Sequence, residues 1–234
     1  MKRLTLAVAM LALLAAGCSD DDNNAVKPDM TSADFTTSGG GDTGAGCGTG
    51  IYPCGPYGTS VGDVVANMEF TGFFDAKHLC KKHKDEVMDT TTVRKLSFKD
   101  FFLGDSSCGN AKPKVLWVMV SAGWCGPCKY EVSTTQGWYT AGQVSDEIAV
   151  LNILFEDEKS LPTKDAFLKK WIADYKLTLP VLMDPSFKLG SFFDRKAVPF
   201  NMLIDTKTMK VAHRKTGADL TGIGKKALEL ANTL

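Results

Sequence analysis

Two cysteines separated by only two residues stand out in the sequence SAGWCGPCKYE, at positions 121–131. Cys125 and Cys128 could form a reactive dithiol, half of a metal site or a structural disulfide. An apolar run with β-branched residues, KVLWVMV (114–120), comes just before them and predicts a buried strand. The pair therefore falls at a strand-to-helix turn. Free N–H groups and the helix dipole there favour a thiolate and lower the pKa of Cys125.

This position predicts a different role for each cysteine. A thiolate at Cys125 would be the nucleophile that attacks a disulfide. Cys128 lies one helical turn further on, where it is better shielded and suited to resolving the mixed disulfide. Pro127 favours helix initiation, because the N–H group that proline lacks would be unpaired in the first turn. Trp124 offers an exposed flat surface beside the reactive sulfur.

The other two interpretations of the pair are less favoured. A metal site would need further ligands, and the best local candidates are His78, Cys80 and His83 in KHLCKKHKDE. Because this segment is highly charged, we expect it to be exposed and predict no metal site. A purely structural bridge is also disfavoured, because a disulfide in such a turn is expected to be reactive.

The rest of the sequence supplies the elements of an α/β fold that would hold this pair. Strands are predicted where apolar and β-branched residues gather, and helices where apolar residues recur with helical spacing. Strands are expected at 68–74, 92–96, 114–120, 148–155, 179–183, 200–205 and 210–215, helices after Cys125, at 162–175 and from 219 to the end, and helical turns at 97–102 and 184–193. The alternation in the first half predicts parallel strands, and the second half adds a hairpin and a closing helix.

The hexapeptide WCGPCK, at residues 124–129, is identical to the active-site motif of the thioredoxin superfamily, and the resemblance covers roughly residues 60–234. It implies a thioredoxin fold, a central mixed β-sheet flanked by helices, here with an N-terminal extension. The sequence AVP at 197–199 resembles the cis-proline segment of this family, and TGA at 216–218 resembles its glycine turn. The resemblance therefore implies a substrate groove formed by Trp124, Gly126, Pro127, Val198, Pro199 and Gly217.

One branch of this family is the most similar. Glu131 completes the pattern CxxCxxE, which with an export signal looks like the membrane-attached extracytoplasmic reductases of the TlpA type, although Ser133 replaces their usual proline. Cytosolic thioredoxins carry a buried aspartate six places before the first cysteine, where this chain has Met119. The sequence therefore does not identify the group that accepts the proton of the buried thiol. Glu156 or Asp157 could replace that aspartate, but both are expected to be ordinary surface acids.

The first residues have the layout of a bacterial export signal. Lys2 and Arg3 precede an uncharged apolar run, 4–16, that is too short to span a bilayer comfortably. The sequence AAGC that ends at Cys18 resembles a lipobox, the site at which bacterial lipoproteins are cleaved before a lipid-modified cysteine. A lipid on Cys18 would anchor the protein to a membrane. Cleavage without lipid attachment is the alternative.

The chain is thus expected to have three regions. They are a signal peptide at 1–17, a lipid-anchored flexible linker at 18–58 and a thioredoxin-like domain at 59–234. The linker is acidic at first and then rich in Gly, Ser and Thr, so it cannot bury enough apolar surface to fold. The net charge of the whole chain is zero, which gives no reason to expect nucleic acid as a partner. We expect a monomer.

Four further cysteines are candidates for structural disulfides. Export would place the chain in an oxidising compartment, where disulfides persist. Apart from Cys18 and the reactive pair, the chain contains Cys47, Cys54, Cys80 and Cys108. We expect a small loop bridge between Cys47 and Cys54 and a second bridge between Cys80 and Cys108. Spacing alone leaves the pairing open.

These features predict a lipid-anchored thiol–disulfide oxidoreductase on the periplasmic side or the surface of the bacterial cell envelope. It would reduce disulfides of exported proteins with no cofactor beyond its own dithiol, and a membrane electron donor would reduce it again. One alternative is a thiol peroxidase of the peroxiredoxin type, but Ala122 stands where that chemistry needs a hydroxyl group. The other is a non-catalytic redox-sensing or binding lipoprotein, which the presence of both cysteines and Pro199 disfavours.

Overall fold

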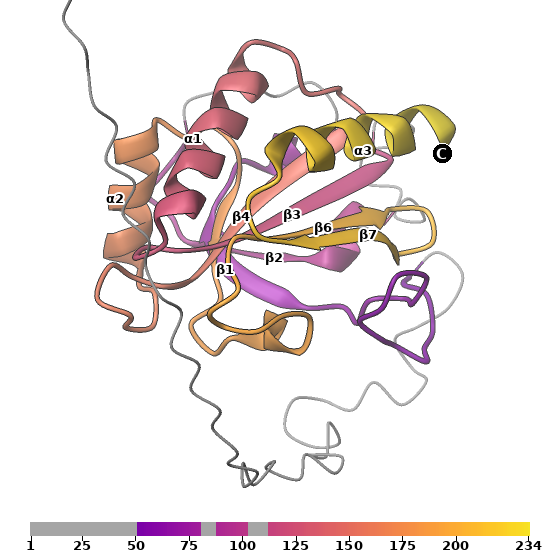
Figure 1. The fold of residues 1–234 in the computed structure, drawn as a ribbon, viewed down its shortest axis with the longest axis horizontal. Coiled ribbons are helices and arrows are strands. Elements are labelled where there is room, and N and C mark those ends of the chain that lie inside the picture. Colours follow the sequence, from indigo (N-terminus) through magenta and orange to yellow (C-terminus); the bar gives the residue numbers. More distant parts are fainter. Residues whose placement is uncertain (1–50, 81–87, 103–111) are drawn as a thin grey trace, which may run out of the picture. The chain divides into compact units, whose positions relative to one another are not determined.

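The computed structural model describes residues 51–80, 88–102 and 112–234 (Figure 1). The strands are β1 (Glu69–Phe73), β2 (Arg94–Ser97), β3 (Val115–Ala122), β4 (Ile148–Glu156), β5 (Val181–Met183), β6 (Phe200–Asp205) and β7 (Lys210–Thr216). The α-helices are α1 (Gly126–Thr140), α2 (Asp165–Tyr175) and α3 (Leu220–Thr233). Short 3-10 helices are η1 (Ala76–Leu79), η2 (Phe98–Phe101) and η4 (Lys188–Ser191).

One mixed sheet holds the strands of the described residues, in the order β2-β1-β5-β4-β3-β6-β7. β3, β4 and β5 run parallel to one another, and the other neighbouring pairs are antiparallel. Parallel neighbours need crossover connections, which α1 supplies between β3 and β4 and α2 between β4 and β5. Both crossovers advance in the same direction across the sheet, so right-handed connections place α1 and α2 on the same face.

Both faces of the sheet are covered. β3 is buried along its whole length, and its side chains alternate between the two faces. Trp117 and Met119 pack in a cluster with buried residues of α1, α2 and α3, among them Trp171. Leu116 packs instead in a second cluster, which includes Phe98 of η2. The α-helices therefore share one face, and the N-terminal segments and η4 cover the other (Figure 1).

The N-terminal extension, residues 51–66, runs along the edge strand β7. The Val65 N–H group donates to the Met209 carbonyl at 2.9 Å, and Val64 forms an isolated β-bridge to β7. Tyr52, which comes from the segment predicted as linker, is buried, and its hydroxyl donates to the Val65 carbonyl at 2.9 Å. The extension therefore supplies core side chains and also pairs with a sheet edge.

The sequence predicts β3, β4 and β6 to within two residues at each end, because each is a continuous apolar run. The predicted start of the second helix is wrong: α2 begins at Asp165, whereas Pro162 forms an isolated β-bridge with Glu156. The predicted signal peptide, 1–17, lies outside the described residues. In the part of the chain that the structure describes, no helix is both long and apolar enough to cross a membrane.

Candidate redox site

The cysteine turn, residues 123–128, joins β3 to α1 and contains a disulfide between Cys125 and Cys128. The two sulfurs are 2.06 Å apart and the two Cα atoms 5.2 Å apart. Cys125 is the N-cap residue of α1, as the strand-to-helix prediction requires, and its Sγ accepts a hydrogen bond from the Cys128 N–H group at 3.1 Å. Pro127 lies in the first turn of α1. Cys125 is 3% exposed and Cys128 fully buried, so a partner reaches Cys125 first.

Trp124 presents an exposed surface beside the disulfide, as predicted, with 36% of its area accessible. Its Nε1–H group donates to Glu156 Oε2 at 2.7 Å, and the other carboxylate oxygen of Glu156 accepts from Arg195. The expectation that Glu156 is an ordinary surface acid is therefore wrong. As the last residue of β4 it is buried, and two donors satisfy its oxygens there.

The loop after β4, residues 157–163, packs directly against the cysteine turn. Asp157 organises this loop, because its Oδ1 accepts two backbone N–H groups of the same loop. The contact is made at Gly123, whose N–H group donates to the carbonyl of Glu156, the residue just before the loop, at 2.9 Å. A Cβ atom on Gly123 would lie 2.6 Å from the backbone carbon of Asp157 and the backbone nitrogen of Glu158. Only glycine leaves room for the loop at this point.

A second enclosed carboxyl group, Glu131, lies on α1 three residues after Cys128. This spacing places both side chains on the same helical face, and both are fully buried. Glu131 Oε1 accepts a hydrogen bond from Asn201 Nδ2 at 2.8 Å, and its Oε2 has no partner among the described residues. Burial raises the pKa of Glu131 to about 7, and the hydrogen bond from Asn201 opposes that rise.

Asn201 is oriented by Trp117, whose Nε1–H group donates to Asn201 Oδ1 at 2.7 Å. Because an indole nitrogen can only donate, this bond leaves the Asn201 amide group to face Glu131. Asn201 pairs across the sheet with Met119, the position at which cytosolic thioredoxins carry their buried aspartate. The Asn201 side chain therefore links Glu131 of α1 to Trp117 of β3.

The sequence interpretation used Glu131 only as a marker of the TlpA-type branch and gave it no chemical role. The available signal was its three-residue spacing from Cys128, which places the two side chains on one helical face. Its complete burial and its bond to Asn201 depend on residues far along the chain, so the spacing alone does not predict them.

The proline loop, residues 194–199, lies beside the cysteine turn. β3 and β6 are antiparallel neighbours, so the segment that enters β6 lies next to the segment that leaves β3. The Val198–Pro199 peptide bond is cis, as the resemblance implies. The Gly217 N–H group donates to the Pro199 carbonyl at 2.8 Å, with Gly217 at φ +82°, a conformation that favours glycine. Val198 packs against the hydrophobic cluster that contains both cysteines of the turn.

Comparisons with protein-family models and with curated proteins give no match. Among solved structures, the chain is similar to a candidate protein disulfide isomerase from Bacteroides thetaiotaomicron, with a TM-score of 0.51 and 15% identity over 75% of this chain and 92% of that one. The chain has a thioredoxin fold. Two further structures with this fold are an exposed lipoprotein thioredoxin from Streptococcus pneumoniae (TM-score 0.46, 21% identity, 70% and 99% covered) and a candidate thiol:disulfide interchange protein from Chlorobium tepidum (0.45, 21%, 75% and 97%).

The cysteines outside the redox pair are accounted for in part. Cys54 and Cys80 are each disulfide-bonded. Cys18, Cys47 and Cys108 lie outside the described residues, so the lipid on Cys18 and the pairing of the other four stay predictions.

The structure describes two of the three residues considered as metal ligands, His78 and Cys80. Cys80 is in a disulfide, and His78 Nδ1 accepts the Asp75 N–H group at 2.9 Å. His83 lies outside the described residues. Among the residues with a described position, no three His, Cys, Asp or Glu side chains are arranged to hold a metal ion.

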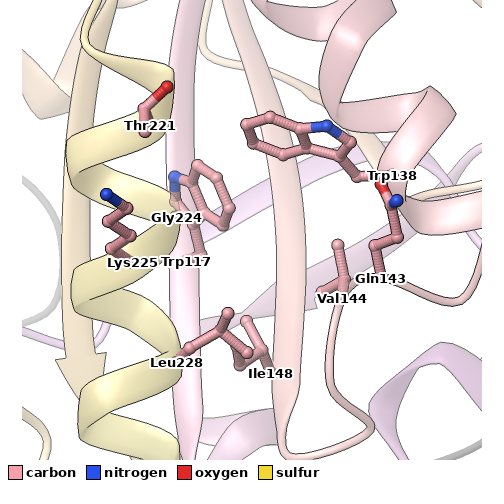
Figure 2. A pocket seen from close by; sticks show the side chains of 9 residues that line it. All are labelled: Trp117, Trp138, Gln143, Val144, Ile148, Thr221, Gly224, Lys225 and Leu228. Atoms are coloured by element: carbon pink, nitrogen blue, oxygen red, sulfur yellow. The ribbon is translucent and has the colours of Figure 1, made fainter.

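A cavity of about 210 Å³ opens between α1 and α3, away from the cysteine turn (Figure 2). Figure 2 shows Trp138 of α1 on one side of it, Leu228 of α3 on the other and Trp117 of β3 between them. Trp138 is thirteen residues beyond Cys125, about 20 Å along the helix axis. The cavity residues come from several separate elements of the thioredoxin fold, so no sequence pattern predicts it.

Proposed function

We propose that the chain is a thiol–disulfide oxidoreductase that reduces disulfides of exported proteins. The observation that carries this proposal is the Cys125–Cys128 disulfide at the N-terminus of α1 in a thioredoxin fold. When the pair is reduced, the free N–H groups of α1 favour a thiolate at Cys125. Cys128, which is fully buried, is then protected from partners but remains within reach of Cys125.

The reaction transfers two electrons from the dithiol to the substrate. The Cys125 thiolate attacks one sulfur of the substrate disulfide, which forms a mixed disulfide and releases the other substrate sulfur as a thiolate. Cys128 then loses its proton and attacks Cys125 Sγ, which restores the intramolecular disulfide and releases the second substrate sulfur. Both substrate thiolates take up protons, and the enzyme is left in its oxidised form.

Glu131 is the proposed acceptor of the Cys128 proton. Its carboxyl group shares a face of α1 with Cys128, and its Oε2 has no partner among the described residues. A pKa of about 7 suits a group that must take up and release a proton near neutral pH. This assignment provides the proton acceptor that the resemblance to thioredoxins leaves open at Met119.

The proposed substrate groove lies between the cysteine turn and the proline loop. An extended substrate chain would pair with the backbone at Val198, beside Pro199, and would lie against Trp124. Two exposed residues of the cysteine turn, Gly126 and Pro127, and the half-buried Gly217 of the glycine turn complete the walls.

An extracytoplasmic location is part of the proposal. The disulfide bonds of Cys54 and Cys80 support it, because structural disulfides persist in oxidising compartments. The export signal and Cys18 support a lipid anchor. Gly126 and Pro127 between the cysteines favour a reducing pair, with a potential near the thioredoxin value of about −270 mV. A reducing pair in an oxidising compartment needs electrons from a donor in the membrane.

The first experiment measures reduction and traps partners. Reduced protein comprising residues 19–234 should reduce insulin, whereas Cys125→Ser should be inactive. In the native envelope, Cys128→Ser should accumulate mixed disulfides with exported proteins, because the resolving thiol is gone, and the matched control Cys125→Ser/Cys128→Ser should accumulate none. Rapid second-order consumption of hydrogen peroxide without insulin reduction would instead indicate the peroxidase alternative. A wild-type chain inactive towards insulin, with no trapped partner, would indicate the binding lipoprotein.

A further inference from the structure

The cysteine turn and the proline loop meet at one buried carboxylate, that of Glu156. Trp124, from the cysteine turn, donates its Nε1–H group to Glu156 Oε2 at 2.7 Å. Arg195, from the proline loop, forms an ion pair with Glu156 Oε1. The Glu156 side chain is only 7% exposed, so both of these charge-assisted bonds are largely shielded from water.

Arg195 is itself held by aromatic rings. Its guanidinium carbon lies 4.5 Å from the centroid of the Phe187 ring and 5.7 Å from that of Phe155. Phe187 in turn contacts Phe193, which stacks at 4.6 Å on Phe200, the first residue of β6. A planar guanidinium group can stack on a ring and donate to a carboxylate at the same time, which a lysine cannot do equally well.

We propose that Arg195 is a positioning residue that acts through Glu156 to keep Trp124 and the proline loop at a fixed separation for an extended polypeptide substrate. This proposal rests on the proposed function and adds a residue that sets the spacing of its groove. A polypeptide that flanks its disulfide on both sides contacts both walls of the groove. A small disulfide needs access only to Cys125, and it depends much less on how the walls are spaced.

Removal of the guanidinium group should therefore change substrate preference. Without Arg195, the Glu156 carboxylate loses one of its two hydrogen-bond donors. The carboxylate can then change position, and the Trp124 indole that donates to it can move as well. A wall displaced by about 1 Å misaligns a bound chain with Cys125, and such misplacement costs about tenfold to a hundredfold in rate. The loss should fall on polypeptide disulfides.

The test compares Arg195→Gln with Arg195→Lys and with Lys196→Gln. The last variant removes the same charge from the next residue of the same loop, so it controls for the electrostatic effect. For each protein, kcat/KM is measured with insulin and the rate constant with the neutral small disulfide bis(2-hydroxyethyl) disulfide. In Arg195→Gln, the ratio of the insulin value to the small-disulfide value should fall about tenfold, mainly through a higher KM. The ratio for Arg195→Lys should lie between those of wild type and Arg195→Gln, and the ratio for Lys196→Gln should stay at the wild-type value even if both of its rates change.

A spectroscopic measurement tests the contact independently of activity. The indole ¹H–¹⁵N resonance of Trp124, assigned by its loss in Trp124→Phe, should shift and exchange faster with solvent in Arg195→Gln, but not in Lys196→Gln. Equal losses with both disulfides, or an unchanged Trp124 resonance, would overturn the role of Arg195. A wild-type chain that reduces neither disulfide would instead refute the proposed reductase function, and the resonance would still report on the contact.

Discussion

The carboxyl group of Glu131 has no access to water, and among the described residues only Asn201 donates a hydrogen bond to it. Burial holds its pKa at about 7, above the ordinary value of 4.5. Below pH 4.5 the group is neutral in both the folded and the unfolded chain. Between pH 4.5 and pH 7 the unfolded chain loses this proton while the folded chain keeps it, so stability falls as pH rises. Above pH 7 the full cost of the buried charge is present.

Glu131→Gln should therefore stabilise the oxidised protein in a pH-dependent way. The amide keeps an acceptor for Asn201 but carries no charge, so the variant and the wild type should be equally stable near pH 4. At pH 8 the variant should be more stable by on the order of 3 kcal/mol, because about 2.5 pKa units of penalty are removed. Urea unfolding at pH 4, 6 and 8 measures this difference, with the exposed Glu158→Gln as control. A difference that stays constant with pH would contradict the prediction.

At the level of elements, the redox chemistry depends on three segments that the sheet brings together. β3 ends at the cysteine turn, β4 ends at Glu156, and β6 begins after the proline loop. β3 and β4 are parallel neighbours, so their carboxyl ends lie at the same end of the sheet. β6 is antiparallel to β3, so the start of β6 lies at that end too. The strand order of the sheet therefore brings the cysteine turn, Glu156 and the proline loop together.

Gly123→Ala should weaken the packing between the cysteine turn and the loop at 157–163. The new Cβ atom would lie 2.6 Å from backbone atoms of Asp157 and Glu158, which cannot rotate away as a side chain can. We expect a loss of about 1–3 kcal/mol in the free energy of unfolding, measured with urea on the oxidised protein. Gly126→Ala is the matched control, because a Cβ atom there meets nothing within 4 Å. Equal stability of both variants would contradict the prediction.

Features that depend on residues close together in the sequence could be predicted, whereas features that depend on residues far apart in the sequence could not. The apolar runs of β3 and β4 and the N-cap position of Cys125 are local patterns, and the structure confirms them. Glu156 was expected at the surface, because the sequence does not show that Arg195, thirty-nine residues later, would pair with it. Long-range contacts between single polar side chains leave no periodic signal in a sequence.

For the whole molecule, the N-terminal extension completes the sheet. A chain that begins at Asn67 would lose the buried side chains of Tyr52 and Val65 and would expose the edge of β7. We expect this truncated chain to unfold at lower urea concentration and to self-associate, because an unpaired edge strand pairs readily with another chain. Light scattering after size-exclusion chromatography measures the association, with residues 19–234 as control. A stable monomeric truncated chain would show that the extension is dispensable.

The two edge strands of the sheet bear on whether copies of the protein associate when they are crowded on a membrane. In the described part of the chain, the edge at β7 is already paired, and the opposite edge, β2, is four residues long and begins with the exposed cations Arg94 and Lys95. Neither edge offers a long apolar strand to a neighbour. If a lipid on Cys18 concentrates the protein in the plane of a membrane, collisions between copies are frequent. Crowded copies should nevertheless not join through strand pairing at these edges, which leaves the cysteine turn of each copy open to a substrate.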